Sequence, residues 1–125
     1  RGIEKATSII SDIRSRGLLP EIIVIALATN YRNITPAMLD NIMSAAGPNH
    51  KFILVTAYAG PTQPRETQNA TMKNYADAHS NVWLVDWYSI AIRDSSLLYN
   101  DRIHLDFAGR ETYANLIANK IKEIQ

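Results

Sequence analysis

An aspartate and a histidine three residues apart are the residues of this sequence best suited to catalysis. Asp101 and His104 lie in the polar stretch YNDRIHLD, which runs directly into a segment with helical periodicity. An imidazole acts as a base when an acceptor fixes one ring nitrogen, so that the other presents its lone pair to a nucleophile. Asp101, in a turn, can be that acceptor. By itself, however, a D-x-x-H pattern more often marks a surface hydrogen bond.

An asparagine amide is the second group that could do chemistry. Asn30 ends the apolar run EIIVIALATN, and its side chain is a donor suited to a developing oxyanion. Removing one such donor commonly costs about 3 kcal/mol of transition-state stabilisation. Together with Asp101 and His104 it would form acyl-transfer machinery without a nucleophile. Taken alone, an asparagine after a strand is more simply a turn or cap residue.

The remaining histidines, serines and acidic residues near these groups have structural explanations. His50 and His79 are expected on a turn and on a helix face, without metal-ligand spacing, so no metal site is predicted. Asp86 follows an apolar run and either ends a strand or holds the neighbouring loop. Ser95 and Ser96 follow an aspartate but no buried strand, and we interpret them as loop residues.

The elements that would position these groups alternate along the chain. Thr35 as N-cap, Pro36 at the first helical position and Gly47 as the stop predict one helix clearly. Other helices are predicted at 6–16, around 67–79 and after the N-cap Asp106, and buried strands at 22–27, 51–58 and 81–88, with a long loop before Asp106. By the right-handed crossover rule, this order predicts a doubly wound α/β fold, a parallel sheet with helices on both faces.

Three strands are few for such a sheet. Strands this apolar need paired neighbours, and the mean sheet has about five or six strands, so we expect at least one strand to be missing. In an open parallel sheet, functional groups collect beyond the C-terminal ends of the strands. Asn30 and His104 are therefore expected to be neighbours in space.

Composition excludes several classes of function. The 125 residues include 13 Lys plus Arg against 12 Asp plus Glu, so no one-sided charge favours nucleic acid as a partner. There is no cysteine, which excludes thiolate catalysis and disulfides, and no apolar run approaches the roughly 20 residues that span a bilayer. No glycine-rich phosphate loop follows a strand, which disfavours a receiver or nucleotide-binding domain.

Three segments taken in order carry a specific resemblance. IIVIALATN, NVWLVDWY and DRIHLDFAGRETYANLIANKI resemble the later blocks of the SGNH, or GDSL, hydrolase family, and within it the catalytic domains of peptidoglycan O-acetyltransferases. The resemblance covers nearly the whole chain. It matches Asp101 and His104 to the Asp and His of a catalytic triad, Asn30 to the oxyanion-hole Asn, and Gly109 to the glycine that opens the last helix.

The sequence departs from the family pattern at several positions. Ala28 stands where the family usually has glycine, and if that position needs a positive φ, alanine would cost roughly 1 kcal/mol or more. Arg102 replaces the small residue between the Asp and the His, and Tyr31 follows Asn30 where relatives have Asp or Gly. The Gly-Asp-Ser block that carries the family's nucleophilic serine does not occur here.

The missing strand and the missing serine lead to one expectation. Residues 1–125 are expected to be the C-terminal portion of a single SGNH-type catalytic domain with a flavodoxin-like sheet, and to be inactive or nearly so alone. The resemblance implies serine-dependent acetyl transfer or ester hydrolysis on a cell-wall glycan, without a cofactor, at the extracellular face of the cell envelope. It also implies that a preceding segment, or a membrane-embedded acyltransferase domain of the same protein, is a partner. The alternative is an SGNH-like domain that has lost catalysis and serves as a binding or interaction module.

Overall fold

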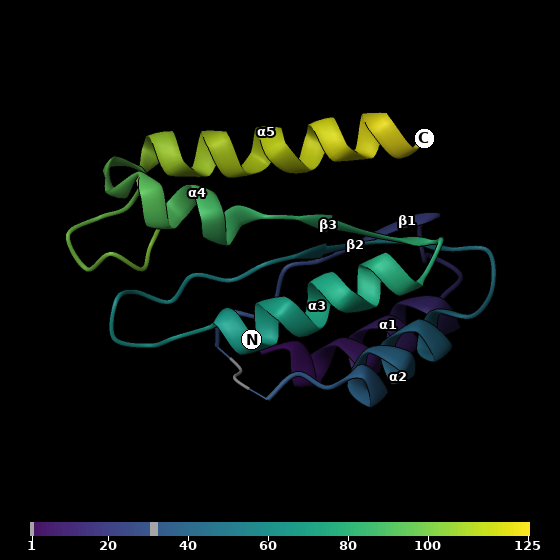
Figure 1. The fold of residues 1–125 in the computed structure, drawn as a ribbon. Helices are drawn as coiled ribbons and strands as arrows, with labels where there is room; N and C mark the ends of the chain where they lie inside the picture. Colours follow the sequence, from purple (N-terminus) through teal and green to yellow (C-terminus); the bar gives the residue numbers. More distant parts are fainter. Residues whose placement is uncertain (1, 31–32) are drawn as a thin grey trace.

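The computed structural model describes residues 2–30 and 33–125 (Figure 1). The helices are η1 (Ile3–Lys5), α1 (Ala6–Ser15), α2 (Pro36–Ala46), α3 (Glu66–Ala78), α4 (Trp87–Arg93), η2 (Ser95–Leu97) and α5 (Phe107–Ile124), where η denotes a 3-10 helix. The strands are β1 (Ile22–Ile25), β2 (Lys51–Val55) and β3 (Val82–Val85). Within the described residues, no helix is long and apolar enough to cross a membrane.

The three strands form one parallel sheet in the order β1-β2-β3. Figure 1 shows α1, α2 and α3 on one face of this sheet and α4 and α5 on the other. Successive side chains of β2 divide between the two faces: Phe52 and Leu54 pack with α1 to α3, while Ile53 and Val55 pack with α4 and α5. The predicted doubly wound α/β fold is confirmed.

The predicted helix boundaries rest on side-chain caps that the structure contains. Thr35 Oγ1 accepts a hydrogen bond from the Met38 N–H at 3.2 Å, and Gly47 ends α2 with φ 83°. Asp106 Oδ1 accepts one from the Gly109 N–H at 2.7 Å at the start of α5. Each cap satisfies a backbone donor that the helix itself leaves unpaired.

The stretch from Asp86 to Leu97 differs from the prediction. β3 ends at Val85, and α4 and η2 fill most of the region predicted as strand end and loop, so Ser95 and Ser96 lie in a 3-10 helix. The cause is another cap. Asp86 Oδ1 accepts from the Ser89 N–H at 3.3 Å and Oδ2 from the Ser89 hydroxyl at 2.6 Å, which starts a helix despite aromatic residues that favour strands.

Candidate active site

Asp101 and His104 form a direct pair. His104 Nδ1 lies 2.6 Å from Asp101 Oδ2, while Asp101 Oδ1 accepts from the backbone N–H groups of Ile103 at 2.9 Å and His104 at 3.0 Å. The hydrogen bond from His104, followed by those two backbone N–H groups, lowers the pKa of Asp101 to about 2. The carboxylate is therefore ionised at neutral pH and can only accept, so Nδ1 carries the proton of this contact. In the neutral ring, Nε2 is left with its lone pair.

The loop that carries the pair is closed at its base. Leu98 and Leu105 form an isolated antiparallel bridge, and the Tyr99 N–H donates to the His104 carbonyl at 2.9 Å. The Asp106 N–H donates to the Leu97 carbonyl at 3.0 Å. These bonds attach the Asp–His loop, defined here as residues 98–106, to η2 and to the first turn of α5.

A glycine is required where α5 passes η2. A Cβ at Gly109 would overlap the carbonyl oxygen of Leu97, so any side chain at this position would push α5 away from the loop. This close approach gives a physical reason for the glycine that the family resemblance predicted at the start of the last helix. The Asp–His loop depends on it, because the loop ends in this helix.

The pair faces open space. It lines a hollow of about 960 Å³ whose walls are Leu98, Tyr99, Asn100, Asp101, His104, Leu105, Asp106 and Arg110. The His104 side chain is 76% exposed and that of Asp101 45% exposed. A ligand can therefore reach the imidazole directly.

The segment between β2 and α3, residues 56–65, touches the Asp–His loop. Gly60 has φ +88°, and a Cβ there would lie 3.1 Å from Ile103 Cγ1 and 3.7 Å from the Arg102 carbonyl oxygen. Figure 1 shows this segment and the loop between α4 and α5 at the same end of the sheet. It is the end at which the strands have their C-termini.

The segment after β1 is joined to the same region. Arg65 donates to the Thr29 carbonyl from Nε at 3.0 Å and from Nη2 at 2.8 Å. Gln68 Nε2 donates to the Ala28 carbonyl at 2.7 Å. Residues 56–65 thus connect the peptide before Asn30 to the Asp–His loop. Among the hydrogen bonds of the described residues none joins Asn30 to His104, so their cooperation stays a prediction.

The departures from the family pattern have different outcomes. Ala28 is buried and its φ is not positive, so the strain expected there is absent. Arg102, in contrast, has φ 57°, and with Asn49 it is one of two such non-glycine residues in the described chain. Tyr31 lies outside the described residues.

Arg65, Gln68 and Asn69 are buried polar residues that sequence analysis missed. They lie at the start of α3, a helix with only a weak apolar pattern. Asn69 accepts from the Ala57 N–H and donates to the Ala57 carbonyl, both at 2.8 Å. Polar residues facing inward from the beginning of a helix that follows a buried strand are the signal that could have found them.

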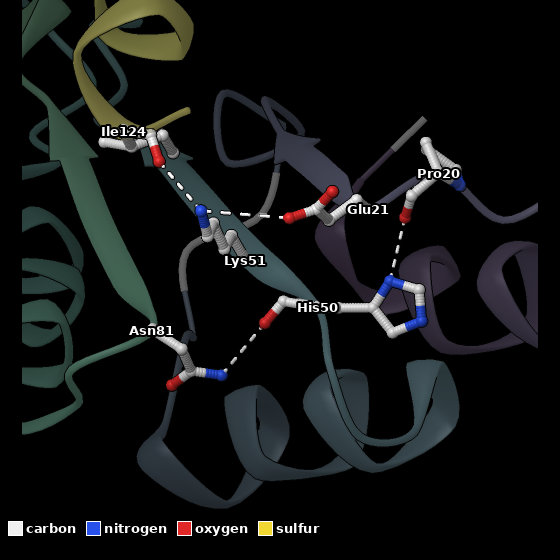
Figure 2. A network of polar contacts seen from close by, with 6 residues as sticks. All are labelled: Pro20, Glu21, His50, Lys51, Asn81 and Ile124. Atoms are coloured by element: carbon white, nitrogen blue, oxygen red, sulfur yellow. Dashed lines mark hydrogen bonds and ion pairs between the residues drawn. The ribbon is translucent and has the colours of Figure 1, made fainter.

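The other candidate residues have structural roles. His50 Nδ1 lies 2.8 Å from the Pro20 carbonyl, and Figure 2 shows it in a polar network at the start of β2. In that network Lys51 Nζ donates to the Ile124 carbonyl at 2.9 Å. The His79 ring stacks on Tyr75 with centroids 3.9 Å apart. Asp86 accepts from the Thr56 hydroxyl at 3.0 Å as well as capping α4.

Within residues 2–30 and 33–125, no group of three or more His, Cys, Asp or Glu side chains could hold a metal ion. The two histidines above use their Nδ1 atoms in contacts with backbone carbonyls.

The sequence is similar to part of one known bacterial protein. No family model matches the sequence. A Bacillus subtilis (strain 168) protein named "Putative peptidoglycan O-acetyltransferase YrhL" is 25% identical over 122 residues, which are 98% of this chain and only 19% of that protein's length.

Two solved structures share the fold. The carbohydrate esterase family 3 structure from Talaromyces cellulolyticus has a TM-score of 0.76 at 19% identity, covering 99% of this chain and 68% of that one. The family 3 carbohydrate esterase of Clostridium thermocellum has a TM-score of 0.74 at 18% identity, with 95% and 64% covered. The resemblance seen in the sequence is thereby confirmed: this chain has the α/β fold of an SGNH-like hydrolase domain.

Proposed function

We propose that the protein is a serine-dependent enzyme that transfers acetyl groups, or hydrolyses acetyl esters, on a cell-wall glycan. His104 is the base and then the acid, Asp101 orients it, and Asn30 donates to the oxyanion. The observation that carries the proposal is the short contact between His104 Nδ1 and the ionised Asp101 carboxylate, in a loop that lines an open hollow. The similarity to a protein named as a peptidoglycan O-acetyltransferase and to two carbohydrate esterases supports the substrate class.

The chemistry follows from this pair. The serine hydroxyl attacks the acetyl carbonyl carbon while His104 Nε2 takes its proton, and the charge on the carbonyl oxygen is met by the amide of Asn30. The ester C–O bond then breaks, and the imidazolium returns the proton to the leaving sugar oxygen. Ionised Asp101 stabilises that imidazolium. Water or a sugar hydroxyl next attacks the acetyl-enzyme, again with His104 as base, and the acceptor that the pocket admits decides between hydrolysis and transfer.

We propose further that residues 1–125 are the C-terminal portion of the catalytic domain and that a preceding βα segment supplies the serine. The sheet supports this, because among the residues that the structure describes no strand pairs with the outer edge of β1. An apolar hollow of about 240 Å³ adjoins β1 and is lined by residues of α1, of β1, of the chain between them and by Leu27. An apolar edge of this kind is normally paired or covered.

The setting of the reaction is part of the same proposal. This chain spans 19% of the length of the Bacillus subtilis protein that it resembles. We propose that the domain acts at the extracellular face of the cell envelope, in a protein that also carries a membrane-embedded acyltransferase domain. Its partners are then the acetylated glycan and that second domain.

A non-catalytic binding module is the second candidate. It is favoured by one observation: Arg102, a bulky cation where the family pattern has a small residue, stands between Asp101 and His104 with φ 57°. The native protein distinguishes the two candidates, because a strand followed by Gly-Asp-Ser ahead of residue 1 supports the enzyme and a strand without serine supports the binder.

Hydrolysis of acetyl esters by the full-length native protein tests the proposed function. His104→Ala is expected to lower kcat by about 10²-fold or more, since it removes the general base. His50→Ala is the matched control. The Nδ1 atom of His50 also contacts an oxygen acceptor, the Pro20 carbonyl, but His50 lies in the polar network at the start of β2. Wild-type turnover in His104→Ala would refute the mechanism.

A further inference from the structure

Two buried side chains hold the peptide that leads into Asn30. Arg65 is 4% exposed and Gln68 2% exposed, although both carry polar groups that are costly to bury without hydrogen bonds. Their donors meet two successive carbonyls of one segment, those of Thr29 and Ala28. A buried guanidinium with two of its nitrogens on one backbone oxygen fixes the direction of that carbonyl.

The direction of the carbonyl determines the direction of the next N–H. No peptide bond of the described residues is cis, and in a trans peptide the C=O and the following N–H point in opposite directions. With the Thr29 carbonyl held by Arg65, the N–H of Asn30 is directed away from the start of α3. Arg65 therefore fixes the plane of the peptide that joins Thr29 to Asn30, and the Asn30 side chain, which is exposed, extends from that fixed peptide.

The same end of α3 also orders the neighbouring segment. Asn69 binds both backbone groups of Ala57, and the Asn69 N–H donates to the Arg65 carbonyl at 2.9 Å within the first turn of the helix. Residues 65, 68 and 69 thus attach the chain after β1 and the chain after β2 to one rigid element. Such support from a helix is what holds a catalytic group to within a fraction of an ångström.

We propose that Arg65 and Gln68 are positioning residues that fix the oxyanion-hole Asn30 through the Thr29 and Ala28 carbonyls. The inference rests on the proposed function, because Asn30 has an oxyanion to bind only in acyl transfer. A displacement of about 1 Å at a catalytic group can lower turnover by about 10²-fold. Loss of the Arg65 donors is expected to act on kcat in this way and to leave KM within about twofold, since Arg65 is buried and does not line the hollow at His104.

A double-mutant cycle in the full-length native protein separates positioning from general stability. Arg65→Met is expected to lower acetyl-ester kcat by about 10²-fold in the native background but by less than about threefold in Asn30→Ala, because the group that it positions is then gone. Arg65→Lys, which keeps the charge and a single donor nitrogen, is expected to restore part of the rate. Gln68→Met repeats the cycle with a smaller loss and decides the question if Arg65→Met fails to fold.

The controls make each outcome decisive. Arg93→Met removes an arginine whose Nε donates to the Ser89 carbonyl of its own helix, and it is expected to leave kcat unchanged. Equal losses in the native and Asn30→Ala backgrounds, or no loss in either, would overturn the positioning role. If His104→Ala retains full activity, the proposed function fails, and this inference fails with it. If His104→Ala is inactive while Arg65→Met and Gln68→Met keep full kcat, only the positioning role fails.

Discussion

The carboxylate of Asp101 is stabilised by three donors that the chain places within four residues. His104 Nδ1 contacts one oxygen, and the backbone N–H groups of Ile103 and His104 donate to the other. Because all three partners belong to one turn, sequence spacing was enough to predict the pair. What spacing could not supply is the closing of the loop by the Leu98–Leu105 bridge, which joins residues brought together by η2 and α5.

This arrangement predicts how the pKa of Asp101 responds to mutation. In His104→Ala the largest cause of the lowered pKa is lost while a backbone donor at each of positions 103 and 104 remains, so the pKa should rise from about 2 without reaching the ordinary value of 3.8. A group whose pKa is depressed by folding stabilises the fold above its unfolded pKa, and that contribution is lost as the pH falls through the folded value. The acid-sensitive window therefore lies between about pH 4 and pH 2.

Carboxyl carbon chemical shifts measured during an NMR titration would check this prediction. Thermal melts across the same window should show a shallower acid loss for His104→Ala than for the wild type, since less of the pKa depression remains. A titration curve of Asp101 that is identical in the two proteins would contradict the assignment of His104 as its main partner.

Arg102 adopts a backbone conformation that arginine does not favour. Its φ of 57° is in the left-handed region, which costs an ordinary L-residue roughly 1–2 kcal/mol and glycine little. Arg102→Gly is expected to raise the free energy of unfolding by about 1 kcal/mol, after the larger entropy of glycine in the unfolded chain is allowed for. Asn49→Gly is the matched control, because asparagine tolerates its φ of 69° and the gain should be much smaller. Denaturant midpoints compare the two, and equal gains would contradict the argument.

At the scale of elements, the contact between Gly60 and the Asp–His loop makes a second glycine informative. Gly60→Ala and Gly17→Ala both place a side chain at a positive φ, of +88° and +69°, so each should destabilise the fold by roughly 1 kcal/mol. They differ in surroundings. The new Cβ meets Ile103 at Gly60, whereas nothing lies within 4 Å at Gly17.

Only Gly60→Ala should therefore displace the Asp–His loop and lower kcat in the native protein. The measurement is a pair of unfolding curves together with steady-state kinetics for both variants. Lowered turnover in Gly17→Ala, or unchanged turnover in Gly60→Ala with the same loss of stability, would contradict this prediction. Either result would show that crowding Ile103 does not change the position of Asp101 and His104.

The elements also show which parts of the fold local sequence could predict. α2 and α5 were predicted because Thr35 and Asp106 cap them and act over three residues. α4 was not, because Trp87 and Tyr88 favour a strand, and Asp86, which caps the helix, is also held by Thr56 of another segment. Arg65 and Gln68 were missed for a similar reason: their partners lie 36 and 40 residues away.

For the molecule as a whole, the two-sided core follows from β2. Phe52 and Leu54 belong to the core beneath α1 to α3, and Ile53 and Val55 to the core beneath α4 and α5. After Lys51 at its start, β2 has only apolar side chains on both faces, which predicts helices covering both sides of the sheet, and the structure has them. The pattern does not say which edge of the sheet stays open, since edges are made of backbone groups that every sequence shares.

Backbone amides can show which edge of the sheet is open in the full-length native protein. The Lys51 N–H donates to the Glu21 carbonyl, so by the alternation along a strand the N–H of Val24 is directed away from β2, toward the open edge. Leu84 is its counterpart on β3, because the Asn81 and Val85 carbonyls accept from β2 and direct the N–H of Leu84 outward. The two amides are a matched pair on opposite edges.

If a preceding strand pairs with β1, the amide of Val24 should exchange with solvent deuterium as slowly as those of its neighbours Ile23 and Ile25, while the amide of Leu84 exchanges faster. Protection of an edge amide requires a hydrogen-bonded partner, because exchange proceeds through opening of that bond. Hydrogen exchange followed residue by residue by NMR makes the comparison within one sample. Exchange at Val24 as fast as at Leu84 would mean that β1 is a true edge, and the serine would then have to reach His104 by a route other than a strand beside β1.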